Sequence, residues 1–322
     1  MNIKIGNTPM IKIKYEYKGK EDFVFSKLES YNITGSIKDR VAFYMINKAY
    51  EKGILKKGMK IVEATSGNTG IALAAIGRYF ENPVHIFMPD WVSKERFDLM
   101  KMYNAEITLV SKKEGGFKNA LEKAKRYARE NDAFLTNQFS NENNILAHYE
   151  TTGKEIIEKI GNNIGGFVSG IGTGGTLMGV GRRLKEFDKN IKIYALEPDK
   201  MPILSQNKII GNHKIEGIGD DFIPEIVNKD IIDFIYVIND DDSINMSRRI
   251  ALDLGIGVGI SSGANMIASV LAKESNNKKI ITVFPDDNKK YLSTELVNPI
   301  DENPNYISNK IKLLDYEFVA DI

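Results

Sequence analysis

Short apolar runs alternate with amphipathic stretches over most of the chain. In each amphipathic stretch the apolar residues return every three or four positions, which is the spacing of one helix face. We expect strands over residues 60–63, 84–88, 107–110, 133–136, 166–169, 191–196, 234–238 and 280–284. We expect helices over residues 93–102, 117–129 and 144–160, helices ending near 79, 187 and 254, and one beginning at 263. This alternation predicts an α/β fold with mostly parallel sheets covered by helices.

The length and composition narrow the class of protein. A chain of 322 residues suggests about two domains. Lys and Arg number 44 against 43 Asp and Glu, and a net charge of +1 argues against a dedicated nucleic-acid binder. The tail beyond Asn298 is polar and predicted to be irregular, packing as an extension or at a subunit contact.

Residue types that are missing or rare exclude several chemistries. The chain has no Cys, so disulfides, thiolate metal sites and a cysteine nucleophile are excluded. Its three His residues (His85, His148 and His213) lie far apart without ligand spacing, so we expect no metal site. Neither a signal peptide nor a membrane span is evident, and a cytoplasmic protein is expected.

A glycine-rich turn at 169–176, Ser-Gly-Ile-Gly-Thr-Gly-Gly-Thr, stands between a predicted strand and a predicted helix. Such a turn lets the backbone approach an anion at a helix N-terminus, and a phosphate group suits it. Gly170, Gly172 and Gly175 also satisfy the G-x-G-x-x-G dinucleotide fingerprint, with Glu197 on the next strand. NAD binding and a tight turn without a ligand are therefore open alternatives.

Lys38 lies at the predicted start of a helix, within Asn32-Ile-Thr-Gly-Ser-Ile-Lys-Asp-Arg40. The positive end of a helix disfavours an ammonium group and favours the neutral amine that a Schiff base requires. Taken alone, a lysine in this position is more often a solvated surface residue.

A second glycine turn, Glu63-Ala-Thr-Ser-Gly-Asn-Thr-Gly70, offers hydroxyl and N–H groups suited to a carboxylate. Together with the two segments above and Gly259-Ile-Ser-Ser-Gly263, it resembles the cysteine synthase and cystathionine β-synthase family. These are pyridoxal 5′-phosphate (PLP) enzymes of fold type II, similar to the tryptophan synthase β-subunit. The resemblance extends from Ile5-Gly-Asn-Thr-Pro9 to Tyr291-Leu-Ser-Thr294.

The resemblance implies a role for individual residues. Lys38 would form the aldimine with PLP and later move protons at Cα, Asn68 would bind the ring hydroxyl oxygen, and Ser261 the pyridine nitrogen. The expected phosphate ligands are Gly172, Thr173, Gly174, Gly175 and Thr176. The expected substrate-binding residues are Thr65, Ser66, Gly67, Thr69, Gln138 and Gly217. A capping or turn role is the alternative for the Ser and Thr residues.

The resemblance also implies the architecture. A smaller, mobile substrate-binding domain (35–145) would be inserted into a larger PLP-binding domain (1–34 plus 146–322), and the protein would be a homodimer. A neutral Ser at the pyridine nitrogen suits β-elimination through an α-aminoacrylate, since it discourages a long-lived quinonoid.

Asp220 and Asp221, in Glu216-Gly-Ile-Gly-Asp-Asp-Phe222, depart from the cysteine synthase pattern. Cysteine synthases usually have Ala-Gly there, whereas cystathionine β-synthases have an Asp at the position of Asp221. We expect Asp221 beside the substrate β-carbon, with Asp220 as its competitor because strand-like alternation would turn only one of them inward. A carboxylate there repels bisulfide and can act as a general base. The alternative is a solvated acidic turn.

These observations favour a PLP enzyme that releases hydrogen sulfide from L-cysteine, with water or a thiol adding to give serine or a thioether. The alternatives are an O-acetylserine sulfhydrylase, an NAD-dependent oxidoreductase, and a scaffold that has lost catalysis, against which the intact Lys38 argues.

Overall fold

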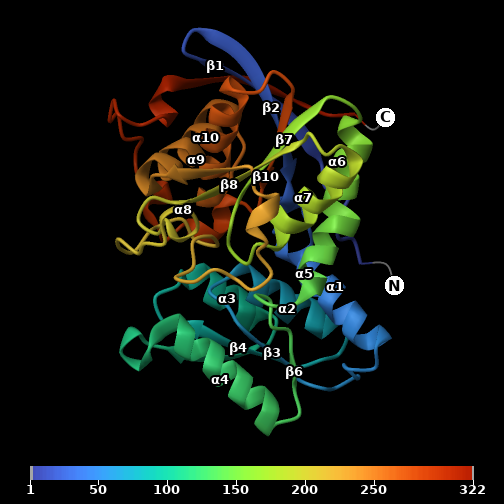
Figure 1. Ribbon diagram of the computed structural model, residues 1–322. Helices are drawn as coiled ribbons and strands as arrows, with labels where there is room; N and C mark the ends of the chain where they lie inside the picture. The colour runs from blue at the N-terminus through green and yellow to red at the C-terminus, as the bar shows by residue number, and fades with distance from the viewer. Residues whose placement is uncertain (1–2, 321–322) are drawn as a thin grey trace.

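Two β-sheets of different size organise the molecule, and helices flank both of them (Figure 1). The structure is a computed structural model that describes residues 3–320. The large sheet has seven strands in the order β11-β1-β2-β10-β7-β8-β9, and the small sheet has four in the order β5-β4-β3-β6. The predicted α/β class with mostly parallel strands is therefore confirmed.

In the large sheet, the neighbouring strands β2, β10, β7, β8 and β9 are parallel, while β1 runs antiparallel to both β2 and β11. Its strands are β1 (Met10–Tyr17), β2 (Lys20–Leu28), β7 (Ile164–Gly170), β8 (Lys192–Pro198), β9 (Phe234–Ile238), β10 (Lys279–Phe284) and β11 (Ile311–Phe318). Lys18 (φ 52°) and Gly19 (φ 74°) form the two-residue turn between β1 and β2. Positive φ at both positions matches the twist of a tight hairpin.

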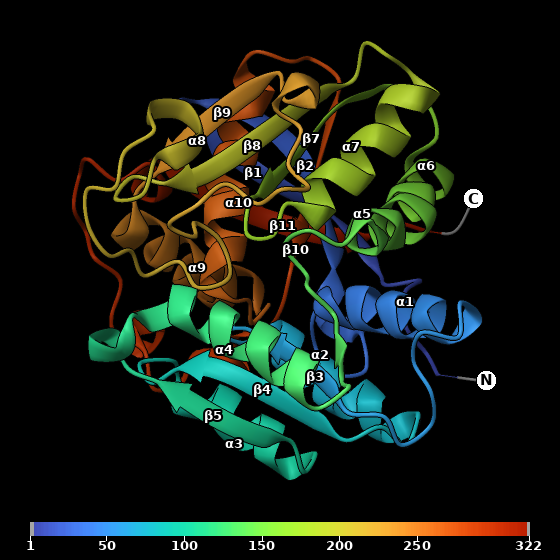
Figure 2. The ribbon, with the colours of Figure 1, turned by 60° about the horizontal axis from the view of Figure 1, so that its bottom comes forward.

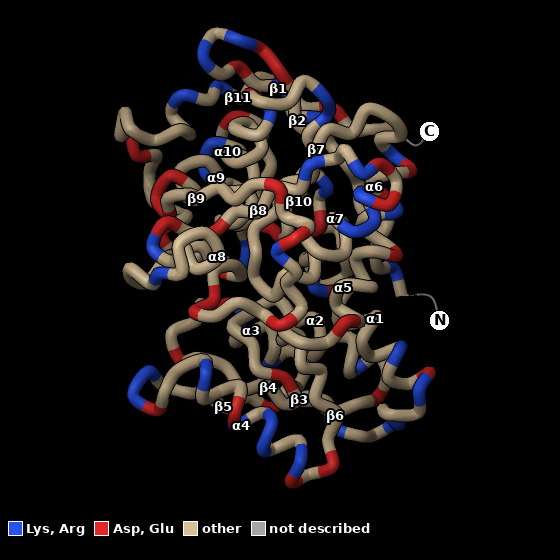
Figure 3. The backbone as a smooth tube through the Cα atoms, in the orientation of Figure 1, with Lys and Arg blue, Asp and Glu red and all other residues tan. Residues whose placement is uncertain are grey.

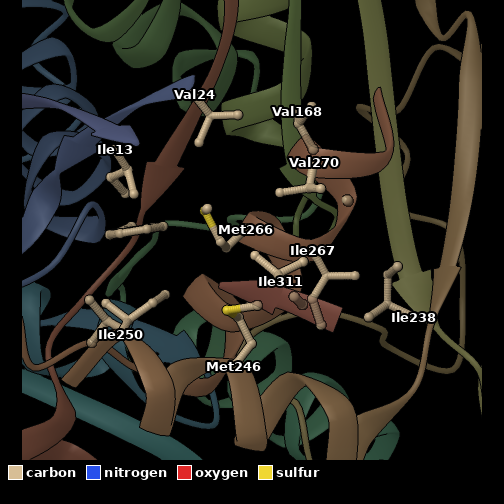
Figure 4. Close-up of a cluster of buried hydrophobic side chains, with 14 of the residues drawn as sticks. Ile13, Val24, Val168, Ile238, Met246, Ile250, Met266, Ile267, Val270 and Ile311 are labelled. Carbon is tan, nitrogen blue, oxygen red and sulfur yellow. The ribbon is translucent and has the colours of Figure 1, made fainter. Parts of the chain in front are cut away.

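Both faces of the large sheet are covered by helices and buried. Consecutive residues of its central strands point to opposite faces, so they enter different apolar clusters. Val168 and Ile280 enter one apolar cluster, beneath α9 and α10; Figure 4 shows this cluster, with Val168 labelled. Their neighbours Phe167 and Ile281 enter the other cluster, beneath α7. This explains why these strands are continuous apolar runs. We call the large sheet and the following helices the large unit: α5 (Glu142–Ala147), α6 (Lys154–Ile160), α7 (Gly175–Phe187), α8 (Ile203–Gln206), α9 (Asp240–Leu254) and α10 (Ile260–Glu274).

The small sheet is entirely parallel and lies below the large one in Figure 1. Its strands are β3 (Ile61–Ala64), β4 (Val84–Pro89), β5 (Glu106–Val110) and β6 (Phe134–Leu135). Together with α2 (Asn68–Tyr79), α3 (Lys94–Met102) and α4 (Gly116–Glu130), this sheet forms the small unit. In the view turned by 60°, α4 crosses in front of β4 (Figure 2).

Helix α1 (Lys38–Glu51) lies between the two units. Ala42 and Ile46 belong to the core of the small sheet, whereas Val41 and Met45 pack with Ala147 of α5. The helix that begins at the candidate lysine is thus in contact with both units.

Two predictions about the elements are wrong in detail. The helix expected over 144–160 is divided by a π-helical segment, His148–Gly153, between α5 and α6. The tail beyond Asn298 is not irregular throughout, because β11 pairs with β1 at the edge of the large sheet. The hairpin of β1 and β2 was not anticipated, although its alternating apolar residues and the Lys-Gly turn are visible in the sequence.

The division of the chain into domains at 35 and 145 stays a prediction; residues 1–2 and 321–322, which it includes, lie outside the described residues. Basic and acidic residues are interspersed along the chain (Figure 3). Within residues 3–320, no helix combines the length and the apolar character that crossing a membrane requires.

Candidate active site

A cavity of about 1140 Å³ is lined by residues from both units. Its wall includes the turns that follow β3, β7 and β10, which are carboxyl ends of parallel strands. Ligands of α/β proteins bind at such ends. The expected site residues that line it are Lys38, Thr65, Ser66, Gly67, Asn68, Thr69, Gln138, Gly172, Thr173, Gly174, Thr176, Gly217, Asp220, Asp221 and Ser261.

Gly175 is the expected site residue that does not line the cavity. A Cβ at this position would lie 1.9 Å from Oδ1 of Asn144, so the residue must be glycine for α7 to pack against α5. Asn144 was missed by the sequence analysis. It is buried and donates to the Thr173 hydroxyl at 2.9 Å, which fixes one hydroxyl of the glycine turn.

Lys38 is the first residue of α1 and is partly buried. Burial lowers the pKa of its ammonium group, although the carboxylates of Asp220 and Asp286 act to raise it. A lower pKa increases the fraction of neutral amine, which is the nucleophilic form. From the sequence we expected the helix N-terminus to lower the pKa of Lys38, whereas burial is the main cause in the structure.

The turn between β7 and α7 forms a backbone cradle. Gly174 has φ +89°, in the left-handed region that favours glycine. A Cβ on Gly172 would lie 2.2 Å from the carbonyl oxygen of Gly217, so the turn and the 216–221 segment are in contact. The first N–H groups of α7 have no partner within the helix, and such groups bind phosphate.

Thr176, in the first turn of α7, is held by a histidine from the π-helical segment. Its Oγ1 lies 3.2 Å from Nε2 of His148, whose Nδ1 lies 3.0 Å from the Thr152 hydroxyl. Burial keeps the pKa of His148 well below its ordinary value, so the ring is neutral. His148 therefore positions the cradle without adding a charge to it.

Asn68 begins α2 at the second glycine turn. Its Nδ2 donates to Oδ2 of Asp286 at 2.8 Å, while its buried Oδ1 has no hydrogen-bond partner among the described residues. The Tyr291 hydroxyl donates to the same Asp286 oxygen at 2.8 Å. Asp286, which the sequence analysis missed, therefore orients Asn68. Its position two residues after a predicted strand was the available signal.

Gln138 connects the second glycine turn to the end of β3. Its Oε1 accepts from the Thr69 hydroxyl at 2.7 Å, and its Nε2 donates to the carbonyl oxygen of Ala64 at 3.1 Å. The Gly67 N–H donates to Thr65 Oγ1 at 3.2 Å. These bonds give the turn a fixed shape at the N-terminus of α2, where a carboxylate is favoured.

Asp220 and Asp221 both contribute to the lining of the cavity, and which of the two side chains serves the substrate stays a prediction. Their segment is irregular, and strand alternation does not apply to it. Burial raises the pKa of Asp220 to about 6; the Asp221 charge adds to this rise and Lys38 opposes it. Asp221 instead forms an ion pair of 3.0 Å with Lys118 of α4. Of these two carboxyl groups, the one that interacts with Lys38 is thus Asp220.

Arg96 of α3 also lies in the cavity wall and was missed, because an arginine in an amphipathic helix is usually a surface residue. Its side chain is 3% exposed and lies over the Tyr291 ring, 4.7 Å from the centroid. It forms an ion pair with Glu216 and packs against Gly67, where a Cβ would lie 2.7 Å from Nε. Arg96 therefore joins the second glycine turn, at Gly67, to the 216–221 segment.

Glu197 does not serve the dinucleotide alternative. Its carboxylate accepts from the N–H groups of Leu204 and Ser205 at 2.7 and 3.0 Å, and it is absent from the cavity wall. The acidic residue that would bind a ribose is therefore committed to capping α8.

Residues 1–286 match the family of pyridoxal-phosphate dependent enzymes. A cysteine synthase of Staphylococcus aureus is 43% identical over 295 residues, which are 91% of this chain and 94% of the relative. The chain belongs to the cysteine synthase family of PLP-dependent enzymes. Its reaction is accordingly a cysteine-synthase-type β-replacement or β-elimination.

Solved structures agree with this assignment. A hydrogen sulfide-producing enzyme of Fusobacterium nucleatum is 49% identical with a TM-score of 0.94, over 99% of this chain and 97% of that one. An O-acetylserine dependent cystathionine β-synthase of Helicobacter pylori is 33% identical with a TM-score of 0.84, over 92% and 99% of the two chains. The PLP fold type II architecture is therefore confirmed.

The cavity fits the cofactor. The unpartnered Oδ1 of Asn68, the Ser261 hydroxyl in the first turn of α10 and the N–H groups at the start of α7 are polar groups that an external partner can satisfy. A pyridine ring with a hydroxyl and a phosphate offers such partners. Across the described part of the chain, the acidic and His side chains form no cluster suited to a metal ion.

Proposed function

We propose that the enzyme favours L-cysteine, releases hydrogen sulfide by β-elimination, and completes turnover when water or a thiol adds at the β-carbon to give serine or a thioether. The observation that carries this proposal is Asp220, a carboxyl group in the cavity wall whose pKa is raised to about 6. The enzyme thereby holds a proton donor near neutral pH beside Lys38.

PLP, when bound, supplies the electron sink for the α-carbon. In this proposal Lys38 attaches the cofactor and then carries the α-proton, a task that its lowered pKa favours. Asn68 binds the ring hydroxyl oxygen, Ser261 the ring nitrogen, and the cradle that begins at Gly172 the phosphate. A neutral serine at the nitrogen leaves it largely unprotonated, which suits rapid loss of a β-substituent.

The substrate carboxylate is assigned to the turn of Thr65, Ser66, Gly67 and Thr69. This turn offers hydroxyl and N–H groups at the N-terminus of α2, and Gln138 fixes the orientation of Thr69. The carboxylate is thus bound by dipoles that are already oriented before the substrate arrives.

Asp220 has two tasks in this scheme. Protonated, it donates to the departing sulfur; ionised by that step, it accepts a proton from the incoming water or thiol. Asp220, once ionised, repels bisulfide, which is an anion, whereas the charge of Asp221 is balanced by Lys118. The ionised Asp220 therefore disfavours the direction that makes cysteine from sulfide.

The relatives support the proposal in part. Two hydrogen sulfide-producing enzymes of Fusobacterium nucleatum resemble the chain, at 49% and 40% identity with TM-scores of 0.94 and 0.84. The Staphylococcus aureus cysteine synthase at 43% identity favours the second candidate, an O-acetylserine sulfhydrylase.

The test compares the two reactions on one preparation. We expect kcat/KM for sulfide release from L-cysteine alone to exceed that for cysteine formation from O-acetylserine and sulfide. Mass spectrometry in ¹⁸O-labelled water identifies serine formed by hydration, and added thiols reveal thioether products. Lys38→Ala serves as the inactive control. A preference for O-acetylserine plus sulfide would establish the second candidate.

We further infer a cytoplasmic homodimer and a mobile domain of about residues 35–145. The domain inference is supported by the Lys118–Asp221 and Arg96–Glu216 pairs, because each joins a helix of the small unit to the 216–221 segment. Light scattering of the purified enzyme tests the dimer. Hydrogen exchange with and without substrate tests the closure, and unchanged protection of 94–130 would contradict it.

A further inference from the structure

Four charged side chains are buried together behind the first turn of α1. Lys27, Glu29, Arg40 and Glu155 form this buried charge cluster, and the side chains of Lys27, Glu29 and Arg40 are 0% exposed. Arg40 binds Glu29 through Nε at 2.7 Å and Nη2 at 3.0 Å. It binds Glu155 through Nη1 at 2.6 Å and Nη2 at 2.8 Å. Lys27 completes the cluster at 2.7 Å from Glu155.

Several residues of the sequence motifs do not line the cavity but form hydrogen bonds with this cluster. The Asn7 N–H donates to Glu155 at 2.9 Å, and the Thr8 hydroxyl donates to Glu29 at 2.7 Å. Asn32, at the start of the lysine motif, donates to Glu29 at 2.9 Å. The N-terminal motif and both ends of the lysine motif therefore converge on this cluster, away from the cavity.

The cluster is electrically balanced, with two cations and two anions. Burial acts to raise the pKa of Glu29, but the Arg40 guanidinium lowers it to about 2, so this carboxyl is ionised. Each Arg40 contact is bidentate, which is the geometry that fixes both position and orientation. Removing one partner of such a buried set leaves an uncompensated charge.

Arg40 connects the buried charge cluster to the candidate active site, because it lies in the same helical turn as Lys38. Successive helical residues turn by about 100°, so Arg40 points about 200° away from Lys38. Lys38 faces the cavity while Arg40, one half-turn on, is fixed from the opposite side. Arg40 therefore helps to hold the first turn of α1 from the side opposite to Lys38.

Glu155 extends the connection to the phosphate cradle. It lies in α6, which continues directly from the π-helical segment that begins at His148. His148 contacts Thr176 of the cradle at 3.2 Å. One continuous element thus contacts the lysine helix at one end and the cradle at the other. π-Helical segments occur frequently at functional sites.

We propose that Arg40 and Glu155 are positioning residues that set the place of Lys38 relative to the phosphate cradle. This rests on the assignment of Lys38 and the cradle to the cofactor, and not on the identity of the substrate. A lysine that is covalently attached to a molecule held at its other end tolerates little displacement. A misplacement of about 1 Å can cost about 10²-fold in rate.

The experiment compares Arg40→Lys, which keeps the charge but loses the fork, with Glu155→Gln, which keeps the shape but loses the charge. Lys273→Gln is the matched control: Lys273 is also buried, pairs with Asp22 at 3.4 Å and lies outside the cavity wall. Cofactor-free protein is titrated with PLP to obtain Kd, and thermal unfolding is followed in parallel. kcat and KM for cysteine are then measured on the loaded enzymes.

We expect both cluster variants to raise the PLP Kd about tenfold and to lower kcat about 10- to 100-fold, with KM within about threefold. The control should lower the unfolding temperature while leaving Kd and kcat unchanged. If the cluster variants only lose stability and keep Kd and kcat within about twofold, the cluster has a structural role alone. Should Arg40→Lys not fold, Glu155→Gln decides the question, and the PLP titration does not depend on which substrate the enzyme uses.

Discussion

Replacing Asp220 with Asn removes a proton carrier from the cavity while leaving its shape nearly unchanged. If Asp220 protonates the departing sulfur and later accepts a proton from the nucleophile, both half-reactions should slow. The loss of one general acid or base typically costs about 10²- to 10⁴-fold. Asp221→Asn is the matched comparison, since Asp221 is paired with Lys118 and should cost less.

The raised pKa determines how much proton donor is available. A carboxyl with the ordinary pKa of 3.8 is protonated in fewer than about one molecule in a thousand at pH 7, whereas a pKa of about 6 gives about one in ten. Burial of Asp220 therefore increases the donor population about 10²-fold. The Lys38 charge acts to lower this pKa, so loss of that charge would shift the pKa of Asp220 upward.

Stopped-flow measurement of the two half-reactions, with sulfide detection, separates the tasks. Sulfide release in the parent enzyme should fall as pH rises through the pKa of Asp220, because the donor is lost. Addition of water should rise over the same range, because the base is gained. In Asp220→Asn both dependences should vanish. Unchanged rates and unchanged pH profiles in this variant would refute the role of Asp220.

The same substitution has a predicted effect on stability. The folded-state pKa of Asp220 is raised, so the native protein binds the proton more tightly than the unfolded chain, and stability falls as pH rises from about 4 through about 6. Asn carries no such penalty. The variant should therefore unfold at a higher temperature than the parent at pH 7, and the difference should disappear near pH 4.

Lys38→Ala should abolish turnover and the borohydride-sensitive yellow colour while the circular dichroism spectrum stays native; retained turnover would contradict the assignment of Lys38. Gly172→Ala should weaken PLP binding at least about tenfold, because its Cβ would lie 2.2 Å from the carbonyl oxygen of Gly217, whereas Gly211→Ala, with no atom within 4 Å, should not; equal Kd values would count against the cradle. Arg96→Gln should raise KM more than it lowers kcat, because the second glycine turn, to which the substrate carboxylate is assigned, loses the support of Arg96. A fall in kcat alone would point to another role.

Much of the fold and the candidate site could be predicted from local patterns. The central parallel strands are continuous apolar runs because helices cover both faces, as Phe167 and Val168 illustrate by entering different cores. Glycine turns after predicted strands identified the positions around Asn68 and Gly172, since cradles of this kind are short, contiguous and restricted in residue type. The antiparallel edge was missed because β11 pairs with a strand about three hundred residues away, which no local window includes.

Relations between distant segments were decided only by the tertiary structure. The sequence by itself determined that Asp220 and Asp221 are adjacent and acidic. The packing of α1 and α4 around an irregular segment decided the rest: it places Asp220 near Lys38 and pairs Asp221 with Lys118. Asp286, Arg96 and Glu155 look like ordinary surface charges in the sequence. Their roles depend on burial and on partners 115 to 218 residues away. Both the pKa of a side chain and its orientation are set by such surroundings.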